Sequence, residues 1–214
     1  MKIIIQFIVL TLLFISTVEA RSNYNKYYSN RHLSKIEKRV ALASTVNKKA
    51  LREAFRFYKK NRYKQRLSKR YIAIADYTKK AGKKRLYIIN LYNGKVYQHH
   101  VAHGKKSGAR GGRVWRSSNK RNSHMTPYGF FKVGIKERVT AKRKYKYLMI
   151  RGLQKSNKKV GLPTRFGGRD VVVHTAGYVK GGGRSYGCFA IKPQDKRAVF
   201  KRLKTALLYS YTGR

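Results

Sequence analysis

The chain has 214 residues, with 53 Lys and Arg against 7 Asp and Glu, a formal net charge of +46 and 42% hydrophobic residues. This length predicts one domain with at most a small appendage. The apolar fraction is that of globular proteins, which excludes a disordered polycation. So much positive charge around a folded core indicates a polyanionic partner.

Residues 1–20 have the features of a signal peptide. Lys2 precedes the mostly apolar run Ile3–Ser16, and Val18-Glu19-Ala20 provides the small or branched residues of a cleavage site. We therefore expect an exported protein, in the periplasm, cell wall or outside the cell; the alternative is a retained N-terminal anchor. No later stretch approaches the ~18 apolar residues of a membrane span. Such a protein meets anionic envelope polymers and wall peptides first, so nucleic acid is not an obligatory partner.

The next segment predicts a basic arm followed by a helix. Residues 21–46 are polar and basic with little periodicity, and we expect a poorly ordered arm. Asn47 is a candidate N-cap for a helix that ends near Asn61. Its apolar residues recur at three- and four-residue spacing and predict one buried face: Ala50, Leu51, Ala54, Phe55 and Tyr58.

From Tyr71 onward the apolar pattern changes to the alternation of strands. The expected strands are Tyr71–Tyr77, Arg85–Leu91, Lys95–Ala102, Phe130–Ile135, Tyr147–Arg151 and Val171–His174. Asn93-Gly94 predicts a two-residue hairpin loop, and a long basic loop covers residues 104–125. A final helix begins near Pro193 and a closing strand covers Leu207–Tyr211. We expect a mainly β, α+β fold, an antiparallel sandwich or barrel-like sheet with a helix at each end.

The single cysteine, Cys188, cannot form a disulfide within the chain. It is a buried small hydrophobe, an intermolecular link or a reactive thiol. Composition alone does not separate these alternatives.

The strongest candidate for chemistry is His174 together with Cys188. A buried strand ends in His174, a glycine-rich loop follows, and Gly187-Cys188 opens the next apolar run. Adjacent strand ends joined in this way bring imidazole and thiol within reach, as a Cys–His nucleophilic pair requires. Backbone N–H groups at Tyr186, Gly187 and Cys188 are candidate oxyanion donors. The alternative is a core histidine beside a buried cysteine.

The local charge predicts a lowered pKa for the Cys188 thiol and a histidine that stays neutral, because Arg184 and the basic surface favour the thiolate and oppose imidazolium. Other chemistries find little support. Residues 183–187 match the G-x-S-x-G pattern of serine hydrolases, but no histidine follows Ser185 to complete the catalytic triad of that fold. The six histidines form no zinc motif, and the few carboxylates do not suggest a glycosidase.

The stretch from His174 to Gly-Arg-Ser-Tyr-Gly-Cys188 resembles the signature of the YkuD-type L,D-transpeptidases, in their murein L,D-transpeptidase catalytic-domain branch. Further segments are similar and occur in the expected order: Ala50–Lys60, Ile72–Asp76, Lys84–Ile89, Val101–Gly104, Pro127–Phe131, Arg151–Leu153 and Leu207–Tyr209. The resemblance covers roughly residues 47–212, which it marks as the catalytic domain.

The resemblance implies a secreted enzyme that remodels peptidoglycan without a metal or organic cofactor. Cys188 would be the nucleophile and His174 the general base, forming a thioester with a wall stem tetrapeptide, releasing D-alanine and passing the acyl group to an amine as a 3→3 cross-link. Two positions depart from relatives: Thr175 follows the histidine where Gly is common, and no Arg stands two places after the cysteine.

Substrate contacts and the acyl acceptor are less defined. The candidate substrate-binding residues are Arg184, Ser185 and His103. Arg184 is a carboxylate clamp or a solvated loop charge, and His103 faces the cleft or merely closes a strand. Water as acceptor would give an L,D-carboxypeptidase, and a D-amino acid would give exchange at the same thioester. A hypothesis of another class is a non-catalytic polycation that binds wall polymer or nucleic acid.

Overall fold

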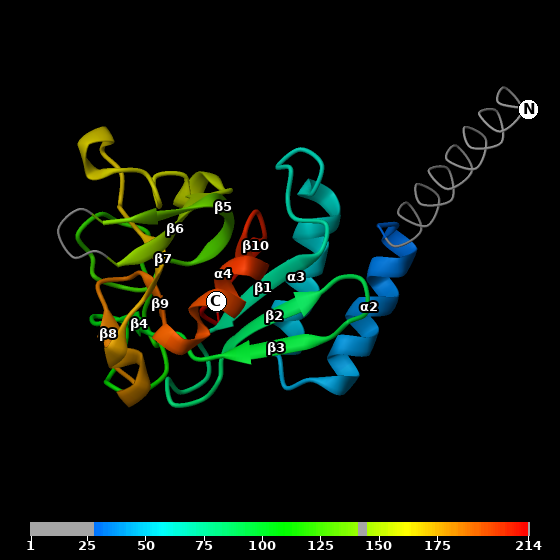
Figure 1. Cartoon of the computed structure of the whole chain (residues 1–214), viewed down its shortest axis with the longest axis horizontal. Helices are drawn as coiled ribbons and strands as arrows, with labels where there is room; N and C mark the ends of the chain where they lie inside the picture. Colours follow the sequence, from blue (N-terminus) through cyan, green and yellow to red (C-terminus); the bar gives the residue numbers. More distant parts are fainter. Residues whose placement is uncertain (1–27, 141–144, 214) are drawn as a thin grey trace, which may run out of the picture.

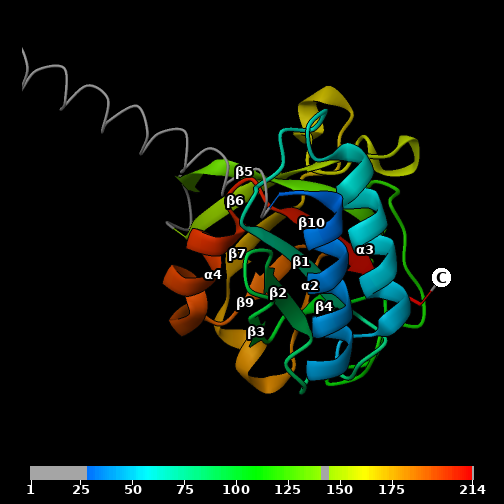
Figure 2. The ribbon, with the colours of Figure 1, turned by 90° about the vertical axis from the view of Figure 1, so that its right-hand side faces the viewer.

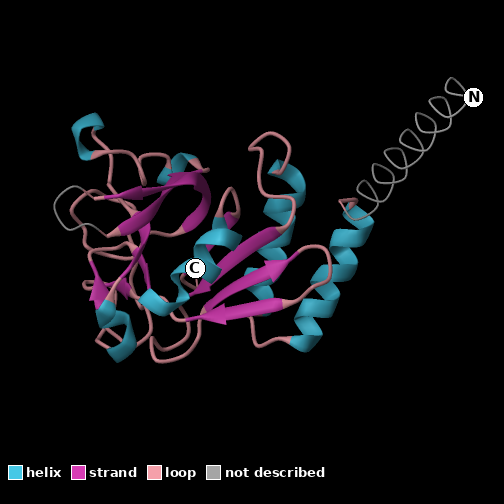
Figure 3. Cartoon of the chain, viewed as in Figure 1, coloured by secondary structure: helices cyan, strands magenta, loops and turns pink. Residues whose placement is uncertain are grey.

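The computed structural model describes residues 28–140 and 145–213 (Figure 1), so the expected signal peptide and the first part of the arm lie outside the described residues. The α-helices and strands are coloured in Figure 3. They are α2 (Asn30–Ala43), α3 (Lys48–Asn61), β1 (Tyr71–Asp76), β2 (Leu86–Asn90), β3 (Val96–His99), β4 (His103–Gly104), β5 (Gly129–Val139), β6 (Lys146–Gly152), β7 (Val172–Thr175), β8 (Arg184–Ser185), β9 (Phe189–Ile191), α4 (Lys196–Leu203) and β10 (Leu207–Tyr211). Short 3-10 turns cover Lys155–Asn157, Thr164–Phe166, Gly177–Gly181 and Pro193–Asp195.

Eight of these strands form one sheet in the order β3-β2-β1-β10-β5-β6-β7-β9, and β4 pairs with β8 beside it. The α+β class with a mainly β, barrel-like sheet is confirmed. Most neighbouring strands are antiparallel, as expected, but β1 runs parallel to β10 and β7 runs parallel to β9. The second exception matters most, because it places the strand that carries His174 directly beside the strand that follows Cys188.

The sheet has a hydrophobic layer on each face, because alternate residues of a strand point to opposite sides. Ile72 and Ile74 of β1 pack with the buried faces of α2 and α3, whereas Ala73 and Ala75 pack with α4. Figure 2 shows α2 and α3 side by side on one face of the sheet, with α4 on another side. Within the described part of the chain, every helix is too short or too polar to span a bilayer.

Helix α3 begins as predicted. The side chain of Asn47 accepts hydrogen bonds from the N–H groups of Lys49 (2.9 Å) and Ala50 (3.1 Å), which satisfies donors that the first helical turn leaves free. All of the predicted stripe residues are buried: Ala50, Leu51, Ala54, Phe55 and Tyr58.

Two local expectations are corrected by the structure. Residues 30–43, inside the expected poorly ordered arm, form helix α2, which buries Leu33, Ile36 and Val40 against α3 and the sheet. The strands β2 and β3 form an antiparallel hairpin, but its loop is longer than two residues. The Asn90 N–H donates to Lys95 O at 2.9 Å, and Gly94 takes a left-handed φ of 75°.

Candidate active site

The candidate site lies along the adjacent parallel strands β7 and β9, with His174 near the end of β7 and Cys188 just before the start of β9. Their register pairs Val173 with Phe189 and His174 with Ala190. Val173 and Phe189 are buried in the hydrophobic core, which fixes the two strands against each other. Cys188 directly precedes β9, so the imidazole and the thiol come from neighbouring parallel strands.

His174 is half-buried, and its hydrogen bond determines which ring nitrogen carries the proton. Nδ1 lies 2.9 Å from the backbone oxygen of Thr175. Because a carbonyl only accepts, Nδ1 donates and Nε2 keeps its lone pair. Burial lowers the pKa of His174 below its usual 6.5, against the opposing effect of the bond to Thr175. The ring also packs 5.1 Å from that of Tyr145. The histidine is therefore held neutral at pH 7 with Nε2 available as a base.

Cys188 is only partly exposed, and the expected lowering of its pKa is wrong. Burial raises the pKa of the thiol; a backbone hydrogen bond from Val172 lowers it, the charge of Asp170 raises it and that of Arg169 lowers it. Arg184, which was expected to favour the thiolate, has a guanidinium that donates to the carbonyls of Lys105 at 3.0 Å and Gly108 at 3.4 Å. The resting sulfur is a neutral thiol, so its reactivity depends on a base.

The turn before the thiol is held by Ser185, whose side chain is buried. Its Oγ accepts from the N–H of Gly187 at 3.0 Å and donates to the carbonyl of Cys188 at 2.8 Å. Ser185 thus shapes this turn and has little surface for substrate. The Gly187 N–H is already used, whereas those of Tyr186 and Cys188 donate to no other residue in the described parts of the chain. These two remain as candidate oxyanion donors.

Arg169 is a site residue that the sequence pattern did not single out. The side chain is only 5% exposed, and its guanidinium donates to the carbonyls of Ser118 and Met125. Burial lowers its pKa to about 10, while the Cys188 charge raises it. A Cβ on Gly187 would lie 2.2 Å from Nη2 of Arg169, and φ of Gly187 is +117°, so space and backbone both require glycine here.

His103, one of the candidate substrate-binding residues, is fully buried. Nη2 of Arg85 donates to its Nδ1 at 2.9 Å. Its strand β4 pairs with β8, with His103 opposite Arg184 and Gly104 opposite Ser185. His103 therefore supports the strand that leads into the turn before Cys188, and it is buried away from solvent. The Lys105 ammonium covers the exposed ring of Tyr186 at 4.3 Å.

We expect the free energy of unfolding to decrease as the pH is lowered, because of His103. Burial, and then the charge of Arg85, lower its pKa from 6.5 to about 4. Below pH 6.5 His103 binds a proton in the unfolded chain but stays neutral in the folded chain. Stability is therefore lost as pH falls, by up to ~1.4 kcal/mol per pH unit. His103→Asn keeps an acceptor for Arg85 without titrating. In urea unfolding, the wild type should lose about 1–2 kcal/mol more than this variant between pH 7 and pH 5. Equal losses would contradict the assignment.

In the described parts of the chain, no three His, Cys, Asp or Glu side chains are grouped as a metal site would need.

Comparison with known proteins adds a family match. A model described as the L,D-transpeptidase catalytic domain matches residues 42–211. The cell shape determining protein Pgp2 of Campylobacter jejuni is 14% identical, with a TM-score of 0.45, over 68% of this chain and 48% of its own. Bd1075 of Bdellovibrio bacteriovorus is 15% identical, with a TM-score of 0.42, over 69% and 49%.

An L,D-transpeptidase (Yku) of Stackebrandtia nassauensis is 14% identical, with a TM-score of 0.40, over 85% of this chain and 77% of its own. This chain spans about half the length of Pgp2 and Bd1075. No curated protein matches it.

Proposed function

Because the chain belongs to the family of L,D-transpeptidase catalytic domains, we propose that it is an exported enzyme that remodels peptidoglycan through a thioester on Cys188. The substrate is a wall stem tetrapeptide. Cys188 attacks the carbonyl of its third residue, terminal D-alanine leaves, and an amine of a second stem peptide takes the acyl group as a 3→3 cross-link.

In this proposal His174 moves the protons. Nε2 takes the proton of the Cys188 thiol as sulfur attacks and gives it to the amine of the departing D-alanine. It then takes a proton from the attacking amine and returns it to sulfur as the thioester opens. A neutral thiol and a neutral imidazole at rest suit this sequence, because charge forms only when substrate is bound.

The negative charge on the carbonyl oxygen is assigned to the backbone N–H groups of Tyr186 and Cys188. Gly187 does not serve, since its N–H donates to Ser185. Removing one donor of an oxyanion hole lowers kcat by about 10²–10³ in a serine protease. The turn must therefore keep its shape, which is the role we assign to Ser185 and Arg169.

The observation that carries the proposal is the parallel register of β7 and β9. It supports a Cys–His pair because it sets Cys188, the residue before Phe189, beside β7, the strand that contains His174. The partial exposure of the thiol supports access to a substrate. The charge of +46 supports retention of an exported protein on an anionic envelope.

The test is incubation with disaccharide tetrapeptide and identification of products by mass spectrometry. We expect a cross-linked dimer and free D-alanine. Disaccharide tripeptide alone would make the protein an L,D-carboxypeptidase, and an exchanged fourth residue would indicate amino-acid exchange. Absence of turnover, with wall or nucleic-acid binding that weakens steeply in salt, would favour a non-catalytic polycation.

A further inference from the structure

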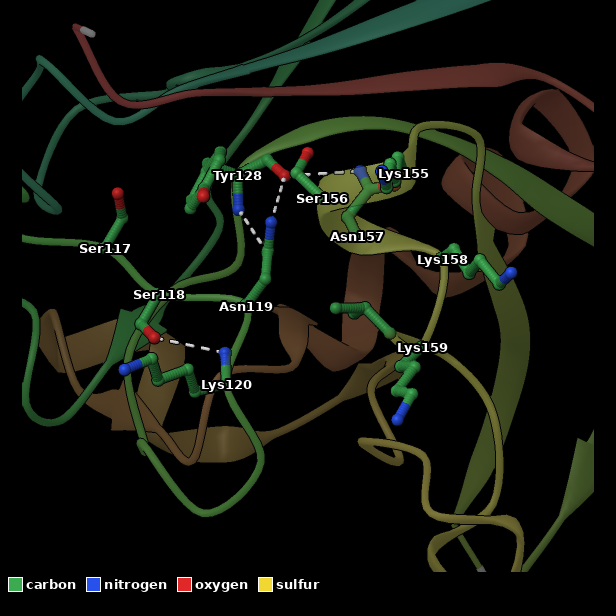
Figure 4. Close-up of a pocket in the computed structure, with 11 residues that line it drawn as sticks. Ser117, Ser118, Asn119, Lys120, Tyr128, Lys155, Ser156, Asn157, Lys158 and Lys159 are labelled. Atoms are coloured by element: carbon green, nitrogen blue, oxygen red, sulfur yellow. Dashed lines mark hydrogen bonds between the residues drawn. The ribbon is translucent and has the colours of Figure 1, made fainter.

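A cavity of about 860 Å³ with a cationic lining lies near the candidate site (Figure 4). Residues 117–120 and Tyr128 form one wall, and residues 155–160 form the other. We call it the lysine pocket, because its lining contains no carboxylate and has the side chains Lys120, Lys155, Lys158 and Lys159. An anionic ligand would meet attraction without repulsion there.

The walls of the lysine pocket are fixed by side-chain amides. Asn119 accepts from the Tyr128 N–H at 3.1 Å and donates to the Tyr128 carbonyl at 3.3 Å, and Asn157 donates to the same carbonyl at 3.3 Å. These bonds are drawn in Figure 4. The amides are thus used in holding the walls. The four lysines are exposed and have no carboxylate partner within the described residues, so their ammonium groups remain available to a ligand.

Arg169 connects the lysine pocket to the turn before Cys188. Its backbone N–H donates to the carbonyl of Lys159, on one wall, at 2.9 Å. Its guanidinium donates to the carbonyl of Ser118, on the other wall. The same guanidinium packs against Gly187, where a Cβ would be 2.2 Å from Nη2. One buried side chain therefore separates the pocket from the residue before Cys188.

We propose that the lysine pocket binds the carboxylates of an acidic stem peptide, as a peptide subsite next to the thioester. The inference rests on the proposed function, in which both substrates are stem peptides. Ammonium groups are point charges on flexible stems, which suits carboxylates spaced along a peptide; a single carboxylate would be held better by the fork of an arginine. The cavity is also within the ordinary size range of ligand pockets.

The test measures binding of a fluorescent synthetic stem tetrapeptide with free carboxylates to the Cys188→Ala protein, which cannot turn it over. The pocket variant adds Lys158→Gln and Lys159→Gln. The matched control adds Lys35→Gln and Lys38→Gln, which remove the same charge from exposed positions on α2. We expect about tenfold weaker binding for the pocket variant and little change for the control. A peptide with its carboxylates amidated should bind weakly to all three proteins.

Three outcomes would overturn the assignment: equal losses in both variants, no loss in either, or binding of the amidated peptide as tight as that of the acidic one. A synthetic glycerol-phosphate polymer is a further probe. If its binding, and not that of the peptide, depends on Lys158 and Lys159, the pocket takes a phosphodiester polymer. A carbapenem tests the Cys188 thiol and not the lysine pocket. Formation of an adduct by the protein with Cys188 intact therefore tests the proposed function separately from the proposed subsite.

Discussion

Cys188→Ala is expected to fold normally and to form no covalent adduct with a carbapenem, whereas the wild type gains the mass of one drug molecule. The acyl group needs the sulfur, and no other cysteine exists to replace it. The side chain is small and packs at the edge of the core, so its truncation should cost little stability. Intact-protein mass spectrometry measures the adduct, and circular dichroism measures the fold.

Ser185→Ala is the matched control for this prediction. Its Oγ bonds to Gly187 and Cys188 and attacks nothing in the proposed reaction. The variant should therefore still form the adduct, more slowly because the turn is less well held. An adduct that survives in Cys188→Ala but disappears in Ser185→Ala would identify a serine nucleophile and reject the proposed chemistry.

His174→Gln is expected to lower the rate of carbapenem acylation by about 10²–10⁴ at pH 7, the usual contribution of a positioned base. Glutamine cannot accept the proton of a thiol that burial keeps neutral. The pH dependence gives a second readout. Since the pKa of His174 lies below 6.5, wild-type acylation should already be level near pH 7. The variant should gain up to tenfold per pH unit between pH 7 and pH 8, as thiolate forms without help.

His100→Gln controls for the loss of a histidine as such. His100 bonds to the carbonyl of Gly82 at 3.2 Å and takes no part in the proposed site. Its acylation rate and pH profile should match the wild type. A flat profile for His174→Gln at unchanged rate would exclude His174 as the base.

The sequence predicts best where one local rule is sufficient. Asn47 accepts hydrogen bonds from the first backbone N–H groups of α3, whose apolar residues repeat at helical spacing. Both features can be recognised in the amino-acid sequence. Alternating apolar residues located β1, β2 and β10 to within about a residue at each end. The same rule was present for α2 in Leu33, Ile36 and Val40, but the many charged and polar neighbours obscured it.

The surroundings of the thiol were not predictable in the same way, because they depend on contacts between distant segments. Arg169 acts through carbonyls of Ser118 and Met125, which belong to a loop with no regular pattern. The pKa of Cys188 depends mainly on burial, which the count of nearby positive residues does not reveal. The sequence likewise left open whether His103 faces the cleft or closes a strand, and its pairing with Arg85 inside the fold depends on a distant segment.

The neutral, mostly covered sulfur has a consequence for durability. Peroxide and other oxidants attack thiolates that solvent can reach, so a protonated and sheltered thiol is oxidised slowly. The exported enzyme that we propose would work outside the reducing interior of a cell and has no second cysteine to form a protective disulfide, so an exposed thiolate there would be inactivated by oxidation. In the proposed mechanism His174 removes the thiol proton only when a peptide is bound, which lets Cys188 persist between turnovers.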